Sequence, residues 1–267
     1  MTTRDFHGKW ALVTGASAGI GVALARELAR QGAKLILTAR RKDRLESLAA
    51  EFAAEGVETR IVVADLGNPD APEQIYAATR DLAVDILVNN AGLGQYGAIH
   101  LRPPEQEFSM VRVNCEAEER LTRLFLPRMV ERRRGWVLVV ASTASFQPVP
   151  YLSTYAATKA FDRFFALGLA AEVAQYGIYV TALCPGTTES EFFEVARASV
   201  FRSRKLQSAE EVARLAIAAL ARGQRTFLPK PSARFTAFLV RLLPVGLITH
   251  FVEKAARPAA KPPASSF

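Results

Sequence analysis

The segment that decides the fold is Thr14-Gly15-Ala16-Ser17-Ala18-Gly19-Ile20-Gly21, which ends a short apolar run and opens a helical pattern. Glycines at such a turn permit a tight bend and a close approach of the backbone to a ligand. The helix that follows offers free N–H groups and the positive end of its dipole to a phosphate. A plain strand-to-helix connection also uses glycine, so the segment alone leaves both interpretations open.

The rest of the chain alternates short apolar runs with longer amphipathic segments. Strands that are apolar on both faces and alternate with helices are typical of a parallel sheet covered on both sides. The sequence therefore predicts an α/β fold, a doubly wound parallel sheet (Rossmann fold), in a single domain. The expected strands are Trp10–Thr14, Lys34–Ala39, Glu58–Val63, Ile86–Asn89, Gly135–Ala141 and Ile178–Cys184, with a weaker candidate at Arg225–Leu228. The expected helices are Ile20–Gln31, Arg41–Glu55, Pro72–Leu82, Pro104–Arg133, Ser153–Gln175 and Ala209–Ala221.

The C-terminal part of the chain has a different character. We assign residues 1–230 to a dinucleotide-binding and catalytic domain, residues 231–256 to an apolar extension of it, and the Pro/Ala/Ser-rich residues 257–267 to a disordered tail. The apolar stretch 235–252 is interrupted by Arg241, Pro244 and His250, which makes it a poor bilayer-spanning helix. It remains a candidate for an interfacial helix, and a membrane surface is therefore one expected partner.

Composition narrows the function classes. The 267 residues carry a net charge of +8, but the basic residues accompany no DNA-binding motif, so nucleic acid is not expected as a partner. Cys115 and Cys184 are too few for a disulfide scaffold or a four-ligand zinc site, and no metal is expected. The polar start, Met1 to Lys9, has no apolar signal segment, so we expect a cytoplasmic protein, with peripheral membrane attachment as the alternative.

The end of the second expected strand indicates the cofactor. An NAD enzyme places an acid here for the ribose hydroxyls, whereas this chain has Arg40 and Arg41. A guanidinium is planar and permanently charged, and it can form two hydrogen bonds with a 2'-phosphate. NADP(H) is therefore favoured over NAD(H), and Arg40 is the better candidate for the phosphate contact. The alternative is that both arginines begin a solvated helix face together with Lys42 and Arg44.

Tyr155 and Lys159 are the candidate catalytic pair. They are four residues apart in a helical stretch and so share one face. A tyrosine is a feeble base at neutral pH, but a neighbouring ammonium and an oxidised nicotinamide favour its phenolate. Such a tyrosine exchanges a proton with a substrate oxygen. The spacing alone also arises by chance in helices, and only its position in the chain distinguishes this pair.

Taken in order, these motifs resemble the short-chain dehydrogenase/reductase family from about Lys9 to Thr188. The resemblance rests on the spacing Thr-Gly-x-x-x-Gly-x-Gly at Thr14 and on Tyr155-x-x-x-Lys159, with Ser142 thirteen residues before the tyrosine. It implies a tetrad of Asn114, Ser142, Tyr155 and Lys159. In it, Tyr155 is the general acid in reduction, Ser142 polarises the carbonyl, Lys159 binds the ribose and tunes Tyr155, and Asn114 holds a relay water.

The resemblance also implies a set of cofactor-binding residues beyond the tetrad. Asp65 would contact the adenine, residues 89–92 would line the ribose, and Thr188 would bond the nicotinamide carboxamide. Taken singly, each of these segments could also be an ordinary turn, because Asn, Asp, Gly and Pro are common in turns. The expected cofactor-binding residues are Gly15, Ser17, Gly19, Ile20, Gly21, Arg40, Arg41, Asp65, Leu66, Asn89, Ala91, Gly92, Tyr155, Lys159, Pro185, Gly186 and Thr188.

The predicted function is an NADP(H)-dependent oxidoreductase that transfers a hydride between the nicotinamide and a lipophilic carbonyl or secondary alcohol, ketoacyl- or steroid-like. Phe192, Phe193, Val195, Val200 and Phe201 are expected to line its apolar pocket, or else to pack the core. The alternatives are a non-catalytic NADP(H)-binding regulator and a peripheral membrane lipid-modifying reductase. The resemblance implies a homo-oligomer, a dimer or tetramer, although the acidic residues 116–119 depart from the family's usual helix.

Overall fold

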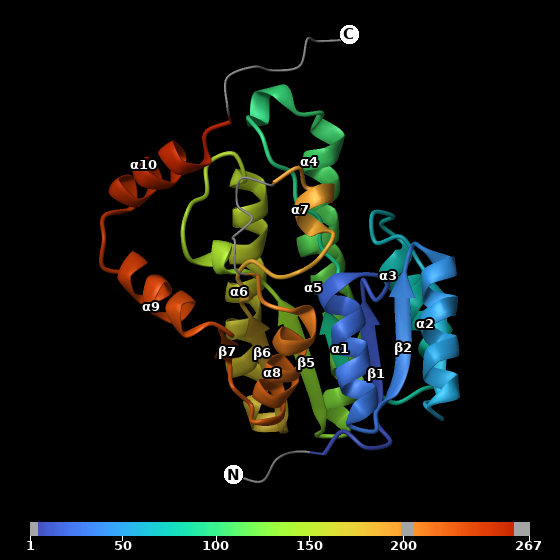
Figure 1. Cartoon of the computed structure of the whole chain (residues 1–267). Coiled ribbons are helices and arrows are strands. Elements are labelled where there is room, and N and C mark those ends of the chain that lie inside the picture. The colour runs from blue at the N-terminus through green and yellow to red at the C-terminus, as the bar shows by residue number, and fades with distance from the viewer. Residues whose placement is uncertain (1–4, 199–205, 259–267) are drawn as a thin grey trace.

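The computed structural model describes residues 5–198 and 206–258, which form seven parallel strands in one sheet with helices on both faces (Figure 1). The strand order is β3-β2-β1-β4-β5-β6-β7, so the chain winds outward in one direction from β1 and then in the other from β4. This is the predicted doubly wound α/β fold. The strands are β1 (Trp10–Thr14), β2 (Lys34–Ala39), β3 (Thr59–Val63), β4 (Val84–Asn89), β5 (Gly135–Val140), β6 (Ile178–Leu183) and β7 (Thr226–Phe227).

Two apolar cores lie on the two faces of the sheet. One core packs α1, α2 and α8 against the sheet, and the other packs α3, α5 and α6 against the opposite face. Central strands β4 and β5 are buried at every position, which explains the apolar sequence of β5 and the apolar run Ile86–Val88 within β4. The helices are α1 (Gly19–Arg30), α2 (Lys42–Ala54), α3 (Ala71–Thr79), α4 (Pro104–Val111), α5 (Ala117–Glu131), α6 (Ser153–Val173), α7 (Phe192–Val195), α8 (Ala209–Ala221), α9 (Pro231–Val240) and α10 (Val245–Ala256). Short 3-10 helices are η1 (Ile99–Leu101), η3 (Thr143–Phe146) and η4 (Ala174–Tyr176).

The prediction of one long helix from Pro104 to Arg133 is wrong in one respect. The structure divides it into α4, a π-helical turn η2 (Arg112–Glu116) and α5. Asn114 lies in that turn, and its side chain hydrogen bonds to the backbone of Leu93, outside the helix. A π turn is a frequent device for placing one side chain at a functional position, and apolar periodicity does not reveal it.

The C-terminal extension forms two helices, α9 and α10, that meet at Pro244. Figure 1 shows them (red) along the side of the molecule beyond β7. One side of α10 is anchored to the body: Ile248 and Ala256 are buried, the Tyr96 hydroxyl donates to the Ala256 carbonyl, and the Tyr151 hydroxyl donates to Glu253. The expected tail, apart from Arg257 and Pro258, lies outside the described residues.

Candidate functional site

A cavity of about 910 Å³ opens at the carboxyl ends of the strands. Its walls come from the turns after β1 to β6 and from α9, segments that span most of the chain. The turns after β1 and β4 face each other across the point where the strand order reverses. In open α/β sheets this crevice is where ligands bind.

The glycine turn has a shape that only glycine fits. Gly15 and Gly19 have φ angles of +65° and +51°, and a Cβ on Gly21 would lie 2.2 Å from the Gly15 carbonyl oxygen. Gly15 and Gly19 line the cavity, together with Ser17 and Ile20. Helix α1 starts at Gly19, and no side chain caps its N-terminal N–H groups. The turn therefore presents free backbone donors to the cavity, which fits a diphosphate.

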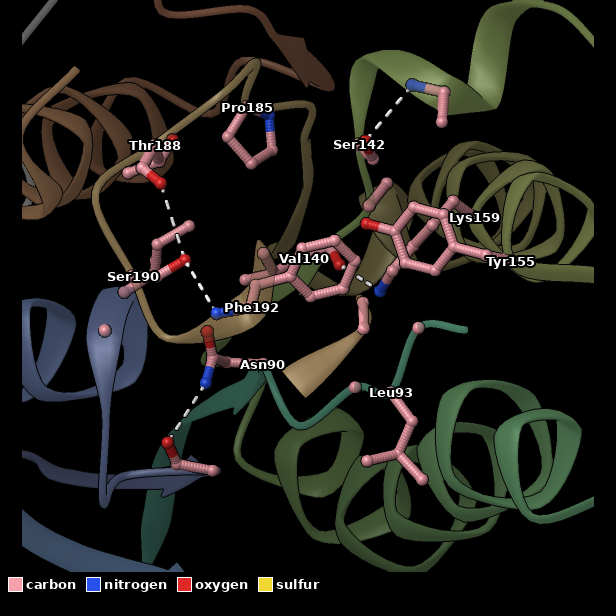
Figure 2. Close-up of a pocket in the computed structure, with 18 of the residues that line it drawn as sticks. Asn90, Leu93, Val140, Ser142, Tyr155, Lys159, Pro185, Thr188, Ser190 and Phe192 are labelled. Atoms are coloured by element: carbon pink, nitrogen blue, oxygen red, sulfur yellow. Dashed lines mark hydrogen bonds between the residues drawn. The ribbon is translucent and has the colours of Figure 1, made fainter. Parts of the chain in front are cut away.

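Gly21 and Asn89 are the two expected cofactor contacts of the β1 and β4 turns that do not line the cavity. Gly21 instead lets α1 pack closely on the turn. Asn89 is buried, and its amide donates to the Thr122 hydroxyl at 2.9 Å, away from the cavity. Its neighbour Asn90, which belongs to the expected segment 89–92 but was not among the named cofactor contacts, lines the cavity and donates to the Thr14 carbonyl at 2.8 Å (Figure 2). Alternation along a strand separates the two asparagines.

A cluster of arginines lies at the end of the cavity beside the turn after β2. Arg40 and Asp65 line it with their charged atoms 3.7 Å apart, and the Arg40 side chain is 63% exposed. Arg41 donates to the Ser17 hydroxyl and pairs with Glu191 at 2.9 Å. Arg44 pairs with the same carboxylate. Hydrogen bonds from Arg41 and Arg44 hold the pKa of Glu191 below its usual value.

Tyr155, Lys159 and Ser142 meet on the cavity wall, where Figure 2 shows the tyrosine ring between the other two side chains. Ser142 follows β5 as the N-cap of η3 and accepts a hydrogen bond from the Ala144 amide, which fixes the turn. The Tyr155 ring lies 5.1 Å from the ring of Phe192, centroid to centroid, so the loop after β6 covers it. The structure thus brings together three of the four residues of the expected tetrad on one wall.

The pKa of Tyr155 lies above its ordinary value, opposite to the lowering that the sequence argument emphasised. Burial raises this pKa most, and Lys159 and the hydrogen bond with Ser142 lower it by less. The Asp162 carboxylate raises it further. Without the charge of an oxidised nicotinamide, the resting tyrosine is therefore a phenol, a proton donor.

Lys159 is buried and held by two contacts within the protein. Its ammonium donates to the Val140 carbonyl and to the Asp162 carboxylate, each at 2.8 Å. A Cβ on Gly92 would lie 3.3 Å from the nitrogen, so glycine is needed where the ammonium reaches the cavity. Burial lowers the pKa of Lys159, but Asp162 and the other nearby acids outweigh burial and raise it overall. The carboxylate of Asp162 was not predicted, because nothing in the sequence distinguishes it from a surface acid.

Asn114 lies behind this wall and does not line the cavity. Its carbonyl oxygen accepts from the Leu93 amide at 2.8 Å, and its amide donates to the Leu93 carbonyl at 3.0 Å and to the Thr158 hydroxyl at 2.9 Å. Both N–H donors of the side chain are therefore used in joining η2, α6 and the loop after β4.

The remaining expected contacts reach the cavity from the turn after β6. Pro185, Gly186 and Thr188 line it, and the Thr188 hydroxyl donates to the Gly186 carbonyl at 3.1 Å. Leu66, Ala91 and Gly92 line it as well.

The substrate end of the cavity has apolar walls. Phe192 and Val195 line it as predicted, and α9 and α10 add Ala237, Val240 and Val252. The expected Val200 and Phe201 lie outside the described residues, as does the side chain of Phe193.

Comparisons with known proteins agree with this arrangement. The family model described as short chain dehydrogenase matches residues 9–200. A short-chain dehydrogenase from Sphingobium yanoikuyae, solved in complex with NADPH, superposes with a TM-score of 0.81 at 31% identity, over 97% of this chain and 100% of that one. A very-long-chain 3-oxoacyl-CoA reductase from Anas platyrhynchos is 34% identical over 253 residues, 92% of this chain and 80% of that protein.

Other relatives are covered less completely. A very-long-chain 3-oxoacyl-CoA reductase-B from Danio rerio is 39% identical over 183 residues, which is 67% of this chain but only 59% of that protein. A hydroxysteroid dehydrogenase-like protein 1 from Gallus gallus is 36% identical over 82% of this chain and 68% of its own length. The chain thus spans about three fifths to four fifths of these three relatives.

Proposed function

The chain belongs to the short-chain dehydrogenase/reductase family, and on that premise we propose that it is an NADP(H)-dependent oxidoreductase that reduces a lipophilic carbonyl compound to a secondary alcohol. The observation that carries the proposal is the wall where Tyr155, Lys159 and Ser142 meet beside a glycine turn with uncapped helix N–H groups. The wall with Tyr155 supplies the proton, and the glycine turn fits the diphosphate of a dinucleotide.

The residues present fit this cofactor. Gly15 and Gly19 adopt positive φ angles, and a Cβ at Gly19 would lie 2.9 Å from the Ser190 Cβ, so these positions keep the cradle open. Lys159 reaches the cavity beside Gly92 with a donor left for a ribose hydroxyl. Pro185 and Thr188 line the cavity as well, where they would contact the amide group of the nicotinamide. When bound, NADPH supplies the hydride that reduces the carbonyl carbon.

The chain's own residues supply the acid and the binding. Ser142 donates a hydrogen bond to the substrate oxygen and holds the carbonyl beside Tyr155. The Tyr155 phenol gives its proton to the same oxygen as negative charge develops there. Lys159 then faces the phenolate with a positive charge and stabilises it. Asn114 keeps the loop after β4 in register with α6, so that these groups stay aligned.

The arginine cluster supports NADP(H) over NAD(H). Arg40 and Arg41 line the cavity where the 2'-phosphate of the adenosine ribose would lie, and Asp65 lies beside Arg40 with their charged atoms 3.7 Å apart. A guanidinium forms bidentate bonds to a phosphate.

The apolar walls support a long or bulky lipophilic substrate. Phe192, Val195, Val240 and Val252 surround the cavity beyond Tyr155. Two relatives are named for very-long-chain 3-oxoacyl-CoA reduction, and we carry that substrate class over as the leading candidate.

The test is the consumption of NADPH and NADH with 3-oxoacyl-CoA thioesters of increasing chain length and with bulky ketones, for the wild type and Tyr155→Phe. We expect kcat/KM to rise with chain length, NADPH to be preferred, and Tyr155→Phe to lose about 10²- to 10⁴-fold in kcat. Tight NADPH binding without turnover across the panel would favour the alternative of a non-catalytic regulator.

We also propose that α9 and α10 rest on an anionic lipid surface. Their outer faces expose large apolar side chains, with Phe235, Phe238 and Phe251 each about 60% exposed. Arg234, Arg241, Lys254 and Arg257, on or next to the same helices, are exposed as well and would complement lipid phosphates, although Arg257 also pairs with Glu253. The inner sides of the same helices line the cavity, so a substrate dissolved in lipid would enter beside Tyr155.

Among the described residues, no helix is both long and apolar enough to cross a bilayer. The lipid proposal is tested by co-sedimentation of the full chain with vesicles of phosphatidylcholine and phosphatidylserine. The double variant Phe238→Ser/Phe251→Ser should bind at least about tenfold more weakly, since each buried phenyl ring contributes about 1.5–3 kcal/mol. Leu101→Ser, which changes an exposed apolar residue of η1 outside both proposed surfaces, is the matched control. Failure of the wild type to bind, or self-association that the double variant abolishes, would contradict lipid as the occupant.

The expected homo-oligomer stays part of the proposal. Phe108 and Val111 on α4 and Phe161 and Phe164 on α6 are exposed, and α4 and α6 are joined by a hydrogen bond from Thr154 to Glu107. A two-fold axis would place this apolar face against its copy. Light scattering of the wild type and of Phe108→Ser tests it, and a wild-type monomer would contradict it. The cytoplasmic location also stays a prediction.

A further inference from the structure

Lys159 shares its buried environment with two carboxyl groups that the proposed chemistry does not use. Asp162 is fully buried, and Glu118, on α5, is 6% exposed. The Asp162 carboxylate accepts from the Lys159 ammonium at 2.8 Å through one oxygen, while its second oxygen has no hydrogen-bond partner among the described residues. One oxygen of Glu118 is also buried without a partner. Such groups are costly in a protein interior unless charge is balanced.

One ammonium cannot balance two buried carboxylates. Burial and the nearby Asp162 raise the pKa of Glu118 well above its usual value, which favours the protonated, neutral form of Glu118. Burial raises the pKa of Asp162 as well, but the Lys159 ammonium in direct contact with it acts in the opposite direction, so we assign the negative charge to Asp162. As seen from Tyr155, Asp162 offsets part of the positive charge of Lys159.

We propose that Asp162 is a positioning residue that holds the Lys159 ammonium and offsets part of its charge, so that the Tyr155 phenol keeps its proton to higher pH than it would beside an unpaired ammonium. The proposal rests on the proposed reductase function, because the phenol is the form that donates to a substrate oxygen. In that step the phenol O–H bond breaks, its electron pair stays on the Tyr155 oxygen, and the proton forms the O–H bond of the alcohol. The hydride that completes the reduction comes from NADPH.

The other ionisable groups around Asp162 do not compensate for its charge at neutral pH. Cys115, in η2, and Cys184, after β6, are near enough to interact with it, but burial raises their pKa values to about 12 and about 11. Both are neutral thiols in the working range. Arg163 interacts with Cys184 and packs over the rings of Phe146 and Phe164. Tyr155, Lys159 and Glu118 are the remaining partners.

The test is the pH profile of kcat/KM for NADPH-dependent reduction by wild type, Asp162→Asn and Glu118→Gln. Removing the Asp162 charge leaves Tyr155 facing an unbalanced ammonium, so the alkaline limb of Asp162→Asn should move to lower pH by about one unit. Glu118→Gln replaces a carboxyl that is already neutral and should leave the limb in place. Glu172→Gln removes an exposed acid from the same helix and is the matched control. A profile of Asp162→Asn that superimposes on the wild type would overturn the proposal.

A second measurement separates this proposal from the proposed function. The phenolate absorbance of Tyr155 is obtained in the near ultraviolet as the difference between each protein and its Tyr155→Phe counterpart. We expect it to appear at lower pH in Asp162→Asn, whether or not any substrate of the panel turns over. An unchanged titration contradicts the role of Asp162, whereas a shifted titration without turnover contradicts only the reductase. If Asp162→Asn does not fold, Asp162→Leu fills a similar volume without charge.

Discussion

Arg40 is the residue on which the choice of cofactor depends. It lines the cavity, its side chain is largely exposed, and its contact with Asp65 is a loose 3.7 Å. We expect Arg40→Ala to raise the KM for NADPH about 10- to 100-fold, the loss of a hydrogen bond to a charged group, with little change for NADH. Lys42→Ala, which removes an exposed cation that pairs with Glu46, is the control in steady-state kinetics. An equal effect on both cofactors would show that Arg40 does not contact the 2'-phosphate.

Glu118 makes the stability of the protein depend on pH. Its pKa is raised in the folded state by burial and by Asp162, so the folded protein keeps a proton that the unfolded chain has lost. The contribution of Glu118 to the free energy of unfolding is fully present below the ordinary pKa of a glutamate. It is lost as the pH rises through the pKa that Glu118 has in the folded protein. Glu118→Gln should therefore raise Tm at pH 8 more than at pH 4. Each kcal/mol gained corresponds to roughly 2–4 °C in a protein of this size. Thermal melts at the two pH values check this, and an equal shift at both would contradict it.

The π turn η2 joins three elements through a single side chain. Asn114 makes three hydrogen bonds, two with the Leu93 backbone and one with Thr158, and is almost fully buried. Asn114→Ala leaves the half-buried backbone N–H and C=O of Leu93 without these partners, which costs at most about 1–3 kcal/mol for each group. We expect a lower urea midpoint together with reduced kcat. Thr158→Val, which removes one of the three bonds, should have a smaller effect, and a larger one would contradict this role of Asn114.

Most elements could be predicted from the sequence because burial on both faces leaves a clear apolar pattern. The first two strands have the predicted ends, and the weak candidate near Arg225 shrinks to Thr226–Phe227 at the edge of the sheet. Periodicity fails where a turn changes the hydrogen-bonding pattern without changing the apolar spacing, as at η2. It also cannot decide which of two adjacent asparagines faces a ligand, so Asn89 was expected where Asn90 lies.

At the scale of the whole molecule, the strand order gathers distant residues at one edge of the sheet. Motifs at Gly15, Arg40, Ser142 and Tyr155 could be found because each has a recognisable spacing or ends a strand. The parts that could not be predicted depend on packing between elements. Glu191 reaches the arginines from a loop 150 residues away, and α10 closes the cavity through Val252.

The most direct measurement is the transfer of deuterium from NADPH labelled at C4 of the nicotinamide to a long-chain 3-oxoacyl-CoA, followed by mass spectrometry of the product. The proposed function predicts one deuterium at the carbinol carbon with the wild type and almost none with Tyr155→Phe. It also predicts that both proteins bind NADPH with similar affinity. Unlabelled product, or labelled alcohol formed equally fast by Tyr155→Phe, would contradict the role of this site.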